Sequence, residues 1–194
     1  IRKDHFPGGM MSKAGYEHNT FKGGGIEEYM ALGYVPFPLT PIKYGFHQDG
    51  AAQTLEYAYQ DYALAQMAKV LNKKEEYDLF SLRANNYKNL FNKEIGWMWS
   101  KNKKGEWNQP IDILDYEKGW VEGNAAQYTW FVPHDVPGLI NLMGGNDAFT
   151  TKLNESFTKA RVHNLGGGGL LPGAPPQYCK PPPVFFATSG GKGE

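Results

Sequence analysis

The stretch from Ala51 to Leu71 limits the possible folds more than any other part of the chain. When it is drawn as a helix, apolar and aromatic side chains occupy most of the circumference instead of a single stripe. A helix of this kind is buried on more than one side. We therefore expect a mostly helical domain in which other elements surround this helix.

A second helix is predicted over residues 75–91. Its apolar residues recur at i, i+4, i+7 and i+11 and leave lysine and asparagine on the opposite face, namely Phe80, Ala84, Tyr87 and Phe91. The connection of residues 72–74 is short, so the two helices should be antiparallel neighbours. A helix buried on most sides, paired with a helix that buries one face, is what a concentric helical toroid requires.

Shorter elements are expected on both sides of this pair. Residues 26–32 should form a helix that ends at Gly33, and the turn around Gly105 should join Trp97–Trp99 to Glu106–Asn108 in a small β-hairpin whose aromatics could line a cleft. Three further helices are predicted, over residues 125–132 with Asn124 as N-cap, over 136–143 and over 147–160.

The composition changes after residue 160. An unbroken glycine run at 166–169 and prolines at 175–176 and 181–183 are typical of a segment without packed elements. We therefore divide the chain into a helical domain over 1–160 and an irregular Gly/Pro-rich tail over 161–194. Cys179 in this tail is the single cysteine of the 194 residues and cannot form an internal disulfide.

Charge and hydropathy exclude several classes of partner. The 20 basic residues balance the 20 acidic residues, and no basic stripe runs along a predicted helix, so nucleic acid is not expected as a partner. No apolar run approaches the roughly 20 residues that cross a bilayer, so no membrane span is expected. His134 has no second histidine at i+4, so it is not expected to bind zinc. We expect its ring to form a hydrogen bond to the backbone or to the substrate instead.

The segment from Gly119 to Asp135 is the candidate site. Glu122 lies beside glycine just ahead of a predicted helix, with Trp120, Tyr128 and Trp130 nearby. Its carboxyl could be a glycosidase acid, which must keep its proton near neutral pH through an apolar setting or a nearby like charge. It could equally cap the helix that follows. The local sequence does not favour either interpretation over the other.

Two acids lie inside the otherwise apolar helix of residues 51–71. Because an unpaired buried charge is expensive, Glu56 and Asp61 should either be paired, for example with Arg83 or a lysine, or face a polar cleft. The first alternative is favoured for each acid taken alone.

Several blocks of the sequence resemble glycoside hydrolase family 92, the calcium-dependent exo-acting α-mannosidases. They follow one another in the family's order over roughly residues 8–160, at residues 24–36, 53–62, 86–91 and 121–135. The block Val121-Glu122-Gly123-Asn124-Ala125-Ala126-Gln127-Tyr128-Thr129-Trp130 is the most specific.

The resemblance implies an all-α fold, part of an (α/α)6 toroid. It also implies an inverting exo-α-mannosidase of the α-1,2 type, whose substrate is a mannose-containing glycan and whose general acid is Glu122. In the family the catalytic base and most calcium ligands come from sequence beyond this chain, so calcium is expected in the parent protein and no metal ligand is assigned here. The chain alone is expected to be an inactive fragment.

For substrate binding we expect a set of residues around Glu122, namely Trp120, Asn124, Gln127, Glu56 and Asp61. Two alternatives to the mannosidase stay open. One is a non-catalytic helical module that binds a glycan or a protein, and the other is an (α/α)6 glycosidase with another sugar specificity.

Overall fold

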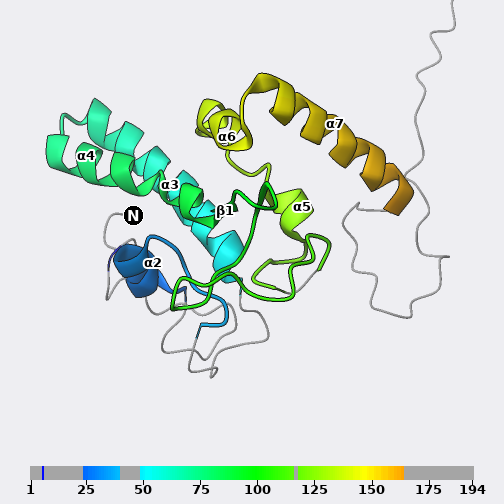
Figure 1. Ribbon diagram of the computed structural model, residues 1–194. Helices are drawn as coiled ribbons and strands as arrows, with labels where there is room; N and C mark the ends of the chain where they lie inside the picture. Colours follow the sequence, from blue (N-terminus) through cyan, green and yellow to red (C-terminus); the bar gives the residue numbers. More distant parts are fainter. Residues whose placement is uncertain (1–5, 7–23, 40–48, 116–117, 164–194) are drawn as a thin grey trace, which may run out of the picture.

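The computed structural model describes residues 6, 24–39, 49–115 and 118–163, and these residues are mostly helical (Figure 1). In chain order the elements are α2 (Ile26–Leu32), α3 (Gly50–Val70), α4 (Lys74–Arg83), the 3-10 helix η2 (Asn86–Leu90), β1 (Phe91–Asn92), β2 (Trp97–Met98), α5 (Ala125–Tyr128), α6 (Val136–Met143) and α7 (Asn146–His163). The expected all-α class with a small β element is confirmed.

Helix α3 is the centre of the domain. Its first residue, Gly50, has no room for a side chain, because a Cβ there would lie 2.7 Å from the carbonyl oxygens of Val35 and Pro36. Helix α4 lies alongside α3, and Figure 1 shows the two helices side by side, joined at one end by a short turn. The predicted antiparallel pair is therefore present.

Three apolar clusters contact α3 along its length, which confirms that the helix is buried on more than one side. The largest contains Leu55 and Ala58 together with Tyr87, Trp99 and Trp120. A second joins Tyr57 to residues of α2 and to Val35, and a third joins Leu64 and Ala65 to Phe80 of α4. On the remaining side of α3, side chains such as those of Tyr59, Met67 and Val70 are exposed.

The single helix predicted over residues 75–91 is wrong. Helix α4 ends at Arg83, η2 follows from Asn86, and Phe91 belongs to a strand. Asn85 lies at the break, where its Nδ2 donates to the carbonyl oxygen of Ser81 at 2.9 Å, and asparagine side chains compete with helical backbone bonds in this way. Phe80, Ala84, Tyr87 and Phe91 are nevertheless all buried, as their spacing predicted.

The predicted hairpin is present only in part. Its turn is correct, because Lys101 bridges Trp107 and the turn closes with Asn102 N donating to Glu106 O at 2.9 Å. The strand Trp97–Met98, however, pairs antiparallel with Phe91–Asn92. Trp99 is fully buried and donates from Nε1 to Asn108 O at 2.7 Å, so it cannot line a cleft.

The C-terminal helices follow the expected order. Helix α5 ends at Tyr128, four residues before the predicted end, and α6 has the predicted bounds. Helix α7 begins one residue earlier than predicted and continues to His163, three residues past the predicted end at residue 160. The rest of the predicted tail, with Cys179, lies outside the described residues. No described helix is long and apolar enough to cross a membrane.

Candidate active site

The loop that carries Glu122 is attached to the N-terminal end of α3. Ala52 N donates to Gly119 O at 3.0 Å. Gly119 has φ +90°, and a Cβ there would lie 3.2 Å from the Cβ of Ser100 and 3.3 Å from that of Phe37. A residue with a side chain would therefore be both strained and crowded, so glycine at this position lets the loop turn against α3.

Glu122 itself has a left-handed backbone, with φ 48°. Its side chain is exposed, and no hydrogen bond or ion pair holds it within the described part of the chain. The other described non-glycine residue with positive φ is Asn72 at the end of α3, where asparagine is ordinary. A glutamate in this region costs on the order of 1–2 kcal/mol of backbone strain.

The cap of α5 is Asn124, so the interpretation of Glu122 as the capping carboxylate is wrong. Asn124 Oδ1 accepts from Gln127 N at 3.1 Å, and Gln127 Oε1 accepts from Asn124 N at 3.1 Å. Together these bonds form a capping box. Asn124 and Gln127 thus have a structural role that needs no sugar, and their expected substrate contacts stay predictions.

The aromatic residues of this segment pack on one another instead of surrounding the carboxylate. Trp120 is 2% exposed and stacks on Tyr128 with a centroid distance of 5.3 Å. Trp130 packs edge-on against Trp97 and Phe149. The expectation that Trp120 presents its ring to a sugar is therefore corrected, because the turn at Gly119 directs its side chain into the core and Trp120 supports the loop from within.

Asp61 is fully buried and cannot contact a substrate, which corrects its expected place in the site. Its Oδ2 accepts from Arg83 Nε at 2.9 Å and from the Tyr29 hydroxyl at 2.9 Å. Pairing with Arg83 was the favoured alternative for this acid, and it is confirmed.

Glu56 differs from Asp61 in each of these respects. It is half-buried and has no partner in the described structure. Burial raises the pKa of its carboxyl above the ordinary value. Of the residues expected to bind substrate, it is the one with an unengaged carboxyl group on the accessible side of α3.

His134 forms the expected hydrogen bond to backbone. Its Nε2 lies 2.9 Å from Ala84 O, and because a carbonyl only accepts, Nε2 carries the hydrogen. The ring lies among those of Tyr59, Tyr62 and Tyr87 at centroid distances of 5.4–6.0 Å. Burial lowers its pKa. His134 thus ties the segment after α5 to the break after α4.

Two glutamines accompany Glu56 on α3 and were not predicted as site residues. Gln53 and Gln60 lie three residues before and four residues after it on α3, and both are half-buried. The i, i+3, i+7 spacing of three polar residues was the available signal, and the apolar majority of the helix concealed it.

A calcium site is not complete within the described residues, which bring together no group of three His, Cys, Asp or Glu side chains. Calcium takes six to eight oxygen ligands, and the described residues bring together too few to hold the ion by themselves. Further ligands would have to come from sequence outside this part of the chain.

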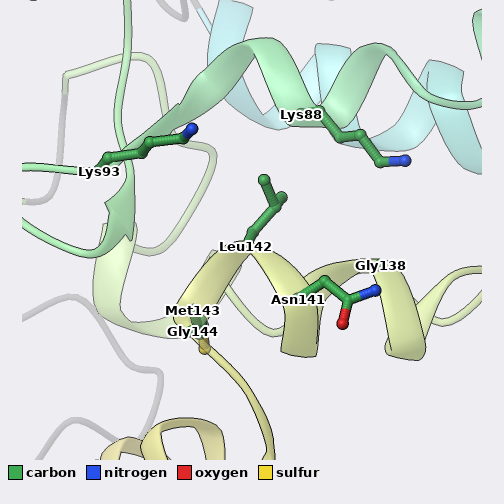
Figure 2. Close-up of a pocket in the computed structure, with 7 residues that line it drawn as sticks. All are labelled: Lys88, Lys93, Gly138, Asn141, Leu142, Met143 and Gly144. Atoms are coloured by element: carbon green, nitrogen blue, oxygen red, sulfur yellow. The ribbon is translucent and has the colours of Figure 1, made fainter.

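A pocket of about 410 Å³ lies between η2, β1 and α6 and contains none of the expected site residues (Figure 2). Its lining includes Lys88 and Lys93 across from Asn141 and Leu142. Lys88 Nζ is held by Asn85 Oδ1 at 2.6 Å and lies 3.5 Å from Asp135. The pocket has no carboxylate in its lining and offers no acid for glycoside hydrolysis, so we place the candidate site at Glu122.

The sequence model of the glycosyl hydrolase family 92 catalytic domain matches residues 6–176. The chain belongs to glycosyl hydrolase family 92. The match passes the boundary that we placed at residue 160, and the division into two parts stays a prediction. The mostly helical structure is that of a partial family 92 catalytic domain.

Two solved structures and one further protein are similar to this family 92 chain. An inverting family 92 mannosidase of Bacteroides thetaiotaomicron VPI-5482 has 36% identity and a TM-score of 0.65, over 74% of this chain and 19% of that protein. A family 92 α-mannosidase of Bacteroides thetaiotaomicron has 40% identity and a TM-score of 0.61, over 69% and 17%. An uncharacterized secreted glycosidase of Arthroderma benhamiae is 27% identical over 155 residues, 68% of this chain and 20% of that protein. The chain thus spans about one fifth of these relatives.

Proposed function

We propose that the parent protein of this chain is an inverting exo-α-mannosidase that removes terminal mannose, of the α-1,2-linked type, from glycans. Glu122 is its general acid. The family and the mannosidase activity named for two solved relatives support this proposal.

The observation that carries the proposal is the conformation of Glu122. A glutamate with φ 48° has a strained backbone. No contact within the described residues compensates for this strain, and Glu122 does not cap α5. Such strain persists where the surrounding structure over-determines a residue, and these residues cluster at functional sites. The loop, fixed by Gly119 at one end and by the capping box at the other, holds the carboxyl group out from the core.

In the proposed reaction the carboxyl of Glu122 gives its proton to the oxygen of the leaving group as the glycosidic bond breaks. A second carboxylate removes a proton from a water molecule that attacks the opposite face of the sugar. In inverting enzymes the two carboxyl groups are roughly 6.5–9.5 Å apart, which leaves room for that water. The second carboxylate and the calcium ligands are proposed to lie outside this chain, so the 194 residues alone do not turn over substrate.

The test uses the complete enzyme from the parent gene, with α-1,2-mannobiose, an aryl α-mannoside and the matching α-glucoside as substrates. Glu122→Gln should lower kcat on mannobiose by about 10²–10⁴-fold, because it removes general acid catalysis. The loss should be much smaller with a dinitrophenyl leaving group, which departs without a proton. Glu94→Gln, an exposed acid on the turn between β1 and β2, is the matched control and should not change either rate.

NMR of the first-formed sugar should show β-mannose, the product of inversion. A parent enzyme that cleaves no α-mannoside would overturn the proposed function. Full activity of Glu122→Gln on mannobiose would overturn the role of this residue. A preference of the enzyme for the α-glucoside would show that it is a glycosidase with another sugar specificity.

A further inference from the structure

The open side of α3 changes character along the helix. Its first part carries three half-buried polar side chains, those of Gln53, Glu56 and Gln60. Its second part carries exposed apolar side chains, with Met67 at 52% and Val70 at 81% exposure. The two parts lie on one face, because residues three, four and seven apart are neighbours on a helix.

The polar part is the end of α3 that touches the loop of Glu122. Ala52, which bonds Gly119, lies one residue before Gln53 and one turn, about 6 Å of helix rise, before Glu56. On the far side of Glu56, Tyr59 packs edge-on against Phe131 and contacts His134 from the same segment. Glu56 thus lies on α3 between two points at which the helix meets the Gly119–His134 segment.

The three polar side chains have hydrogen-bonding capacity that the described part of the chain does not use. No side-chain hydrogen bond of Gln53, Glu56 or Gln60 occurs within the described structure. Two primary amides both donate and accept, and a carboxylate accepts. A sugar hydroxyl also donates and accepts, so this set can satisfy neighbouring hydroxyls of one ring. The side chain of Glu56 is half-buried, which raises the pKa of its carboxyl, and hydrogen bonds are stronger where water is partly excluded.

We propose that Gln53, Glu56 and Gln60 form the edge of the substrate site that binds the hydroxyl groups of the terminal sugar. The edge lies along α3 beside the loop of Glu122. This inference rests on the proposed function, because it assigns to the same site the residues that distinguish one sugar from another. They are substrate-binding residues and take no part in proton transfer.

The test compares the complete enzyme with its Gln53→Ala, Glu56→Gln, Glu56→Ala and Gln60→Ala variants. The substrates are an aryl α-mannoside and its 2-, 3-, 4- and 6-deoxy analogues. Loss of a hydrogen bond to a substrate hydroxyl should lower kcat/KM on the full sugar by about 10–100-fold. The same variant should equal the wild-type enzyme on the one analogue that lacks the bonded hydroxyl. Gln66→Ala, farther along α3 and also half-buried, is the control and should leave all five substrates unchanged.

An equal loss on all five substrates would show that the three residues have a structural role and would overturn the inference. The absence of any loss at all three positions would also overturn it. Glu56→Gln keeps the size of the side chain, so the comparison across the deoxy series holds even if Glu56→Ala does not fold. If the wild-type enzyme cleaves the mannoside and the variants show no hydroxyl-specific loss, this inference fails while the proposed function stands. If the wild-type enzyme cleaves no mannoside, the proposed function has failed.

Discussion

Arg83 Nε donates to the carboxylate of Asp61 over 2.9 Å, and both side chains are buried. The Tyr29 hydroxyl donates to the same carboxylate oxygen, so one acid joins α2, α3 and α4. The guanidinium also lies over the rings of Phe6, Tyr29 and Phe80 at 5.3–5.6 Å. This network holds α3 in place, and α3 in turn supports both Gly119 and Glu56.

Breaking the buried pair should be severely destabilising. Either Asp61→Asn or Arg83→Met should lower the free energy of unfolding by about 3–5 kcal/mol, because one buried charge loses its counterion. The measurement is urea unfolding of the chain followed by circular dichroism.

The control for this prediction is Lys74→Met. Lys74 pairs with Asp78 at 2.6 Å, but that pair is exposed to solvent, and its loss should not measurably change stability. The double variant Asp61→Asn with Arg83→Met should lose less than the sum of the single variants, since it leaves no uncompensated charge. Additive losses would show that the two groups do not act as a pair.

Gly138→Ala tests the close contact between η2 and α6. A Cβ at this position would collide with the Asp135 carboxylate and with the Tyr87 hydroxyl, which bond each other at 2.7 Å. We expect a loss of about 1–3 kcal/mol in the free energy of unfolding, as for other overpacked sites. Asn141→Ala, on an exposed position of the same helix, should have little effect. Equal unfolding midpoints of the two variants would contradict this packing.

Asp135 should make the chain less stable in acid. Burial alone would raise its pKa, but hydrogen bonds from Tyr87 and Gly138 N and the charge of Lys88 outweigh burial and lower it. A lowered pKa in the folded state means that the unfolded chain binds the proton more readily, so the contribution of Asp135 is complete above about pH 4 and is lost as the pH falls through the folded pKa. The stability difference between wild type and Asp135→Asn should therefore shrink between pH 5 and about pH 2, as measured by urea midpoints. A difference that stays constant over this range would refute the assignment.

His134 should give a separate pH dependence at higher pH. Burial among Tyr59, Tyr62 and Tyr87 disfavours the imidazolium and lowers the pKa, although the bond to Ala84 O and the charge of Asp135 act in the opposite direction and Lys88 reinforces the decrease. The unfolded chain therefore binds this proton first, and stability should decline as the pH falls below about 6.5 towards the lower folded value.

His134→Gln is the comparison for this prediction. An amide can still donate to Ala84 O, but it does not titrate, so the decline between pH 7 and 5 should be smaller in the variant than in the wild type. The measurement is the thermal midpoint across that range. If the thermal midpoints of wild type and variant changed in parallel between pH 7 and 5, His134 would not titrate in this range.

Periodic features of the sequence predicted much of the fold. Helix α3 with its burial on several sides, the antiparallel helix after it and α6 all follow from the spacing of apolar residues and from capping residues. The break after Arg83 was not predicted, because the helical spacing of apolar residues reports only which side chains are buried. Buried side chains occur at this spacing in the observed structure too, although it is not one continuous helix, namely those of Phe80, Ala84, Tyr87 and Phe91. The pairing of Trp97–Met98 with Phe91–Asn92 depends on contacts that local sequence does not encode.

The candidate site was predictable only as a segment. Sequence reasoning placed Asn124 at the cap and Glu122 in the same block, but the backbone of Glu122 has no local signature beyond its neighbouring glycine. The burial of Trp120 depends on the turn at Gly119, which points that side chain inwards. Asp61 and Glu56 have the same residue chemistry in the same helix, and only the three-dimensional neighbours separate an ion pair from an unengaged acid.

Glu122→Gly provides the last prediction, because it separates stability from function. At φ 48° glycine has no Cβ strain, so the variant should gain up to about 1 kcal/mol in the free energy of unfolding, after allowing for the greater freedom of glycine in the unfolded chain. Asn72→Gly, at φ 54°, is the matched control and should gain less, since asparagine tolerates this region. In the complete enzyme Glu122→Gly should lose turnover on mannobiose while its unfolding midpoint rises. A midpoint below that of the wild type would mean that the glutamate side chain stabilises the loop, and the argument from strain to function would then fail.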